Sequence, residues 1–168
     1  MVDKYQQYFN VDALCLHDDW GSQRAPFFSL DTVMEMIVPH LKKVVDHCHS
    51  RGLFFDMHSC GKNELLVPAY IAAGVDSWSG QPMNDKAMLY EKYGDKIILG
   101  IDPKGSIDMT KSGTVPMATP EEAIQSAKEF VQTYAPNYAN KPVICGTYIG
   151  PAEFAETLYV ESRKALNP

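Results

Sequence analysis

The sequence predicts an α/β protein built from about five consecutive parallel βα units. Short apolar runs, typical of buried strands, alternate with longer segments of helical period, and this alternation repeats to the end of the chain. The expected strands are 11–16, 53–58, 75–79, 97–101 and 141–146. Because the carboxyl ends of parallel strands meet at one edge of a sheet, we expect the functional residues at that edge.

Helices are expected between and after the strands, at about 29–51, 63–73, 85–93, 119–134 and 151–166. In the first of these, Pro39 predicts a kink. The spacing of its apolar residues predicts a buried stripe made of Leu30, Val33, Met34, Ile37, Leu41, Val44 and Val45. Thr119 starts the clearest helix, since the sequence Thr-Pro-Glu-Glu supplies an N-cap, a first-turn proline and a capping-box glutamate. The irregular stretch 102–118 has the length of a lid or binding loop.

Composition narrows the function classes. The 168 residues suit a single globular domain, with 45% hydrophobic and 21% charged residues. Fifteen basic against 21 acidic residues give a net charge of −6, so we expect no nucleic-acid partner. No apolar run reaches the ~18–20 residues that span a bilayer, and the first residues lack an apolar signal core. We therefore expect a cytoplasmic protein with no membrane partner, whose cysteines are thiols or metal ligands.

Three residues at the predicted edge suggest a metal site. His58 and Cys60 lie two apart at the end of the second strand, so their side chains project to one side. Cys145 ends the fifth strand. One histidine with two cysteines suits Zn²⁺ and leaves one position open for substrate. The alternative is that these cysteines are packed hydrophobic residues, which is the expectation for Cys15 and Cys48.

The end of the first strand carries His17 followed by two carboxylates, Asp18 and Asp19. These acids are candidates for general acid/base catalysis, metal ligation or binding of a cationic group. The alternative is that one of them caps a backbone turn. Asp102, after the fourth strand, presents the same choice, and Trp20 is either a pocket wall or a core residue.

Taken in order, these segments resemble the C-terminal half of the uroporphyrinogen decarboxylase superfamily. The resemblance covers most of the chain and is carried by His-Asp-Asp-Trp-Gly-Ser-Gln (17–23), Met-Ile-Val-Pro-His-Leu-Lys (36–42), His-Ser-Cys-Gly (58–61), Ala-Gly-Val-Asp (73–76), Lys-Tyr-Gly-Asp (92–95) and Gly-Ile-Asp (100–102). It implies a partial TIM (β/α)8-type barrel, with 1–168 as a single partial domain. A complete barrel typically needs ~250 residues.

Within that superfamily, the cobalamin-dependent methyltransferases carry a zinc motif, His-x-Cys followed much later by Cys. His58, Cys60 and Cys145 match it, which implies Zn²⁺, a corrinoid carried by a partner protein, and methyl transfer to or from a thiol or a methoxylated small molecule. The alternatives are a uroporphyrinogen decarboxylase, with Asp18 or Asp19 binding the pyrrole NH groups, and an inactive fragment that acts as a binding module. Unpaired strand edges of a partial barrel predict self-association.

Overall fold

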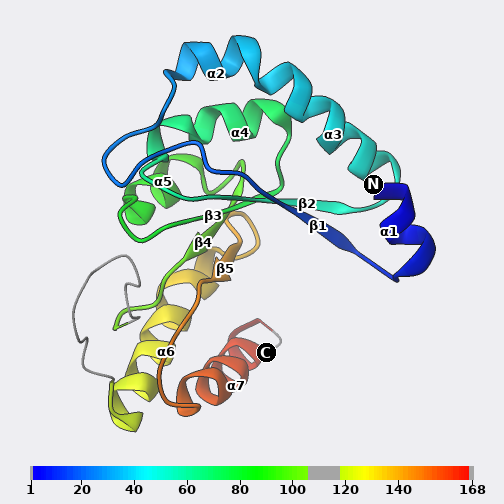
Figure 1. Cartoon of the computed structure of the whole chain (residues 1–168). Helices are drawn as coiled ribbons and strands as arrows, with labels where there is room; N and C mark the ends of the chain where they lie inside the picture. The colour runs from blue at the N-terminus through cyan, green and yellow to red at the C-terminus, as the bar shows by residue number, and fades with distance from the viewer. Residues whose placement is uncertain (1, 106–117, 167–168) are drawn as a thin grey trace. The chain divides into compact units, whose positions relative to one another are not determined.

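A computed structural model describes residues 2–105 and 118–166, and it confirms the α/β class (Figure 1). Five parallel strands alternate with helices and lie in one sheet in chain order. They are β1 (Ala13–His17), β2 (Phe54–Ser59), β3 (Ser77–Gly80), β4 (Ile98–Ile101) and β5 (Val143–Cys145). This arrangement is consistent with part of a (β/α) barrel.

The chain forms two compact units, Met1–Leu99 and Gly100–Pro168, and the division falls within β4. The prediction of a single partial-barrel domain stays a prediction. Most of the predicted 102–118 loop, residues 106–117, lies outside the described residues. Within the described ranges, no helix combines the length and the apolarity needed to cross a membrane.

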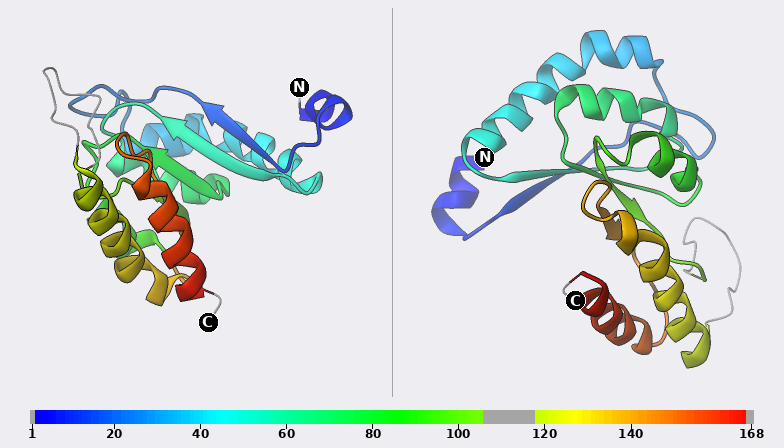
Figure 2. Two further views of the ribbon diagram at one scale, coloured as in Figure 1. Left: turned by 90° about the horizontal axis from the view of Figure 1, so that it is seen from below. Right: turned by 180° about the vertical axis from the view of Figure 1, so that it is seen from behind.

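The first unit contains α1 (Val2–Tyr8), α2 (Leu30–Met36), α3 (Val38–Ser50), the short 3-10 helix η1 (Glu64–Leu66), α4 (Val67–Ala73) and α5 (Lys86–Tyr93). Helices α2, α3 and α4 cover one side of strands β1–β3 (Figures 1 and 2). The fully buried side chains under them include Val33, Val45, Phe55, Met57, Tyr70 and Trp78. The opposite side of β1 and β2 is therefore the one available for a site.

The predicted helix over 29–51 is two helices. Ser29 caps α2, accepting a hydrogen bond from the amide of Thr32, as expected for a serine before an apolar helix. The break falls at Ile37, so that Pro39 occupies the first turn of α3, where its missing N–H costs nothing. The predicted kink is thus a one-residue break at Ile37, which keeps right-handed helical torsion angles.

The predicted burial of Met34 and Val44 is wrong, since they are 40% and 44% exposed. Each helix buries only a narrow stripe, and these two residues lie outside it. Helix α1 was not expected at all. It contacts the end of α3 through Asp3, whose Oδ1 lies 2.7 Å from Arg51 Nη2. Because α1 buries no residue, its sequence has no apolar periodicity from which a helix could be predicted.

The second unit contains α6 (Pro120–Tyr134), the 3-10 helix η2 (Ala135–Asn137) and α7 (Glu153–Leu166). The predicted capping box is confirmed: the Glu122 amide donates to Thr119 Oγ1 (3.2 Å), and the Thr119 amide donates to Glu122 Oε2 (2.7 Å). A small core of Ala123, Ala127 and Phe154 joins α6 and α7. The Phe154 ring stacks on Tyr148 with 3.9 Å between centroids.

Candidate metal centre

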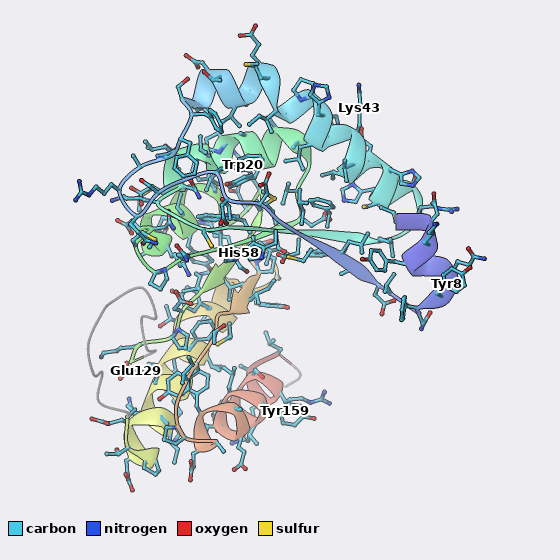
Figure 3. All side chains as sticks on the ribbon, in the orientation of Figure 1. Tyr8, Trp20, Lys43, His58, Glu129 and Tyr159 are labelled. Carbon is cyan, nitrogen blue, oxygen red and sulfur yellow. The ribbon has the colours of Figure 1, made fainter. Side chains whose placement is uncertain are left out.

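The site in the first unit begins with the pairing of β1 and β2. The strands are parallel, and their register places His17 opposite His58 at the carboxyl ends. Paired residues in neighbouring strands project to the same side. The two imidazole rings meet edge to face, with 4.4 Å between centroids and an interplanar angle of 84°. His58, labelled in Figure 3, is half-buried, whereas the His17 side chain is 66% exposed.

Cys60 joins these two rings from the turn that follows β2. Its Sγ lies 3.5 Å from His58 Nε2 and 3.9 Å from His17 Nε2. The ligand atoms of His17, His58 and Cys60 all lie within 4.8 Å of one another. Two nitrogens and one sulfur thus converge on one point, and this is a donor set that Zn²⁺ accepts.

The backbone around Cys60 is held from several directions. The buried Asn63 side chain donates through Nδ2 to Ser59 Oγ (2.8 Å) and to the Cys60 carbonyl (2.5 Å). Gly61 has φ +93°, and a Cβ added there would clash with the carbonyl oxygen of Gly21. A left-handed glycine in close contact with another backbone segment leaves the turn little freedom. The backbone position of Cys60 is therefore fixed by the fold.

Electrostatics favour neutral imidazole at His58. Burial lowers the pKa of His58, and the nearby His17 lowers it further. Burial also raises the pKa of the Cys60 thiol, and the hydrogen bond and charge of Asp19 add to this effect. Without a cation the thiol stays protonated at neutral pH. A bound divalent cation would reverse that preference, since a coordinating thiol is deprotonated outright.

The two carboxylates predicted as catalytic have structural partners here. Asp18 Oδ2 accepts a hydrogen bond from the Trp20 indole (2.9 Å), and Trp20 is a core residue, 4% exposed. Asp19 Oδ1 accepts one from the Cys60 amide (3.1 Å) and lies 3.9 Å from His17 Nε2. Hydrogen bonds from Cys60 hold the pKa of Asp19 below its usual value. The backbone-capping alternative thus describes Asp19, and the acid/base role stays a prediction.

Cys145 lies at the end of β5 in the second unit. It is half-buried and packs against the core of Ala123, Ala127 and Phe154. Burial, with a smaller contribution from the charge of Asp102, raises its pKa to about 11. These surroundings are those of a packed thiol, and its place in a zinc site stays a prediction.

The two remaining cysteines differ in burial. Cys48 is fully buried in α3, as predicted, whereas the predicted packing of Cys15 is wrong. Cys15 is exposed because β1 lies at the edge of the sheet and only one of its residues is even half-buried.

His17 is the site residue that sequence reasoning noted at the edge without assigning to the metal. The signal that could have found it is the register of β1 and β2, which two short apolar runs do not specify. No protein-family model and no curated protein sequence matches this chain.

Proposed function

We propose that this chain is the zinc-binding part of a methyltransferase that moves a methyl group between a corrinoid protein and a thiol or methoxylated small molecule. The observation that carries the proposal is the convergence of His58 Nε2 and Cys60 Sγ, 3.5 Å apart, at the carboxyl edge of a parallel sheet. Catalytic groups of (β/α) barrels lie at that edge. With Cys145, these residues are the proposed zinc ligands.

The residues of the first unit fit such an ion. Burial keeps the His58 ring neutral, which is the form that ligates a metal. Bound Zn²⁺ would act as a Lewis acid on a substrate thiol or ether oxygen in the open position. Asp19, whose pKa is held low, is ionised at neutral pH, so its Oδ1 is a proton acceptor beside His17 rather than an acid. Asp18 orients Trp20 through the indole hydrogen bond.

The proposed partners and location follow from the same chemistry. A corrinoid protein would present its cofactor to this edge, and the cytoplasm would keep Cys60 and Cys145 as thiols. Strand β1 lies at the edge of the sheet, so its free hydrogen-bonding groups could pair with a second copy of the chain. A rise in apparent mass with concentration on size exclusion would support this self-association, and a constant monomer mass would oppose it.

Elemental analysis and a methyl-transfer assay test the function. We expect one zinc ion per purified chain, and transfer from methylcobalamin to a small thiol seen as loss of the methyl-cobalt absorbance. Cys60→Ser should abolish both results. Cys15→Ser is the matched control, because Cys15 is an exposed thiol in the neighbouring strand. A chain without zinc, in which iodoacetamide freely alkylates both Cys60 and Cys145, would refute the proposal.

A further inference from the structure

We infer that His17 is a direct metal ligand through Nε2. His17, His58 and Cys60 would then form a three-ligand site within the first unit, and metal binding would not require Cys145. This inference shares the metal with the proposed function but does not depend on methyl transfer. It differs from the ligand set expected from the sequence, in which the third ligand comes from β5.

The distances between the donor atoms carry the inference. In a tetrahedral site with Zn–N of about 2.0–2.1 Å and Zn–S of about 2.3 Å, nitrogen and sulfur ligands lie about 3.6 Å apart. The two separations in the cluster, His58 Nε2 to Cys60 Sγ at 3.5 Å and His17 Nε2 to Cys60 Sγ at 3.9 Å, bracket that value. All three donor atoms, the two ring nitrogens included, lie within 4.8 Å of one another.

The backbone supports all three ligands independently. His17 and His58 are a register pair of parallel strands, so both rings project to the same side of the sheet, opposite to the side on which the buried Met57 lies. Cys60 is held by Asn63 Nδ2 and by the left-handed turn at Gly61. A site whose ligands are supported by paired strands and a fixed turn is largely formed before the ion arrives.

The charges near the cluster suit a divalent cation. The Asp19 carboxyl group lies beside the cluster, with its Oδ1 3.9 Å from His17 Nε2. Metal binding would also place a thiolate at Cys60, because a coordinating thiol is deprotonated outright. A carboxylate and a thiolate beside two imidazoles supply the negative charge that one Zn²⁺ or Co²⁺ ion requires.

X-ray absorption at the zinc edge tests the ligand set on the unmodified full chain. We expect one sulfur and at least two imidazole nitrogens around the ion. The set of His58, Cys60 and Cys145 would instead give two sulfurs and one imidazole. Two sulfurs in the first shell would overturn the inference.

Titration with Co²⁺ alone, followed by the d–d and sulfur-to-cobalt absorption bands, tests the residues. Loss of a hydrogen-bonding residue behind a ligand already costs about 10–100-fold in affinity, so His17→Gln should weaken binding at least about 100-fold. His47→Gln is the matched control, because His47 is also exposed and beside a carboxylate, with Nε2 3.2 Å from Asp3 Oδ1. We expect His47→Gln and Cys145→Ser to bind Co²⁺ within about threefold of the unmodified chain. Circular dichroism checks that each variant is folded.

The outcomes separate this inference from the proposed function. Unchanged Co²⁺ affinity in His17→Gln, or loss of binding in Cys145→Ser, would overturn the inference while leaving a zinc methyltransferase possible. Metal binding that depends on His17, with no methyl transfer under any condition, would support the inference and refute the proposed function. An unmodified chain that binds neither Zn²⁺ nor Co²⁺ would refute both.

Discussion

Two cysteines of this chain occupy equivalent places in the sequence and different surroundings in the structure. Cys60 directly follows β2, Cys145 is the last residue of β5, and each directly precedes a glycine. In the first unit, the neighbouring strand supplies an imidazole, and Cys60 Sγ faces two ring nitrogens. In the second unit, Cys145 packs on the apolar contact between α6 and α7. The chemistry of a strand-end cysteine is therefore decided by the elements beside it, not by its local motif.

Alanine substitution of the glycines after these cysteines should give the largest difference in the free energy of unfolding between the two units. Gly61→Ala must force a left-handed φ and a clash with the backbone of Gly21, so we expect a loss of about 3 kcal/mol or more in the free energy of unfolding. At Gly146 no left-handed φ is needed, and the nearest obstacle is the side chain of Asp102, so about 1–2 kcal/mol is expected. Urea unfolding measures both. Equal losses would show that the turn at Gly61 is not specially constrained.

Thiol reactivity should separate the two cysteines next. Only the thiolate is alkylated, and its fraction rises tenfold per pH unit until the pH reaches the pKa. With a pKa of about 11 against an ordinary 9.0, Cys145 should carry about a hundredfold less thiolate at pH 8 than an unshifted thiol. Its alkylation rate should still be rising at pH 10, and a plateau near pH 9 would contradict its burial. With the ligand set of His17, His58 and Cys60, added Zn²⁺ should protect Cys60 and leave Cys145 unchanged, as read by mass spectrometry of iodoacetamide-labelled peptides. Protection of Cys145 as well would instead support the set of His58, Cys60 and Cys145.

Removing a buried polar support should affect the metal only in the first unit. Asn63→Ala removes two buried hydrogen bonds, those that Nδ2 donates to Ser59 Oγ and to the Cys60 carbonyl, so we expect a loss of about 1–3 kcal/mol in the free energy of unfolding. Because the turn that positions Cys60 loosens, Co²⁺ affinity should also fall about 10–100-fold. Ser126→Ala is the matched control in the second unit, since the buried Ser126 hydroxyl donates to the Lys104 carbonyl. A similar loss of Co²⁺ affinity in Ser126→Ala would contradict the separation of the two regions.

Removing the N-caps of α6 and α2 should give the smallest difference in the free energy of unfolding. Thr119→Ala removes one half of a reciprocal capping box and should cost about 1–2 kcal/mol, whereas Ser29→Ala removes a single cap hydrogen bond and should cost about 0.5–1 kcal/mol. Thermal unfolding by circular dichroism compares them. Ser50→Ala, at the last residue of α3, is expected to stay within about 0.5 kcal/mol of the unmodified chain. A larger loss at Ser29 than at Thr119 would reverse the expected order.

The sequence was sufficient where local chemistry decides the structure. Ser29 and Thr119 start helices because their side chains replace missing intrahelical hydrogen bonds, and both caps could be predicted from neighbouring residues. It was also sufficient to put His58 and Cys60 on one side of a strand end. The sequence alone did not show that His17 is the third member of this cluster. His17 lies 41 residues before His58 and meets it only through strand register, which depends on how two strands pack against α2, α3 and α4.

Burial was the other property that a single sequence could not give. Met34, Val44 and Cys15 have apolar side chains and periodic positions, yet each is exposed. The width of a buried stripe depends on what lies opposite a helix, and the burial of a strand depends on whether both its faces are covered. One face of β1, which lies at the edge of the sheet, is not covered.

Strand β1 therefore combines two properties that are seldom found together. It supplies a ring to the candidate metal centre, yet four of its five residues are exposed and none belongs to the buried core. Substitution of His17 is therefore expected to change the metal-binding side chains with little loss in the free energy of unfolding. Replacing His17 by cysteine or aspartate would tune the hardness of the donor set while the interior stays intact. If His17 is a ligand as inferred, the metal preference of the first unit is expected to change through single substitutions at this position.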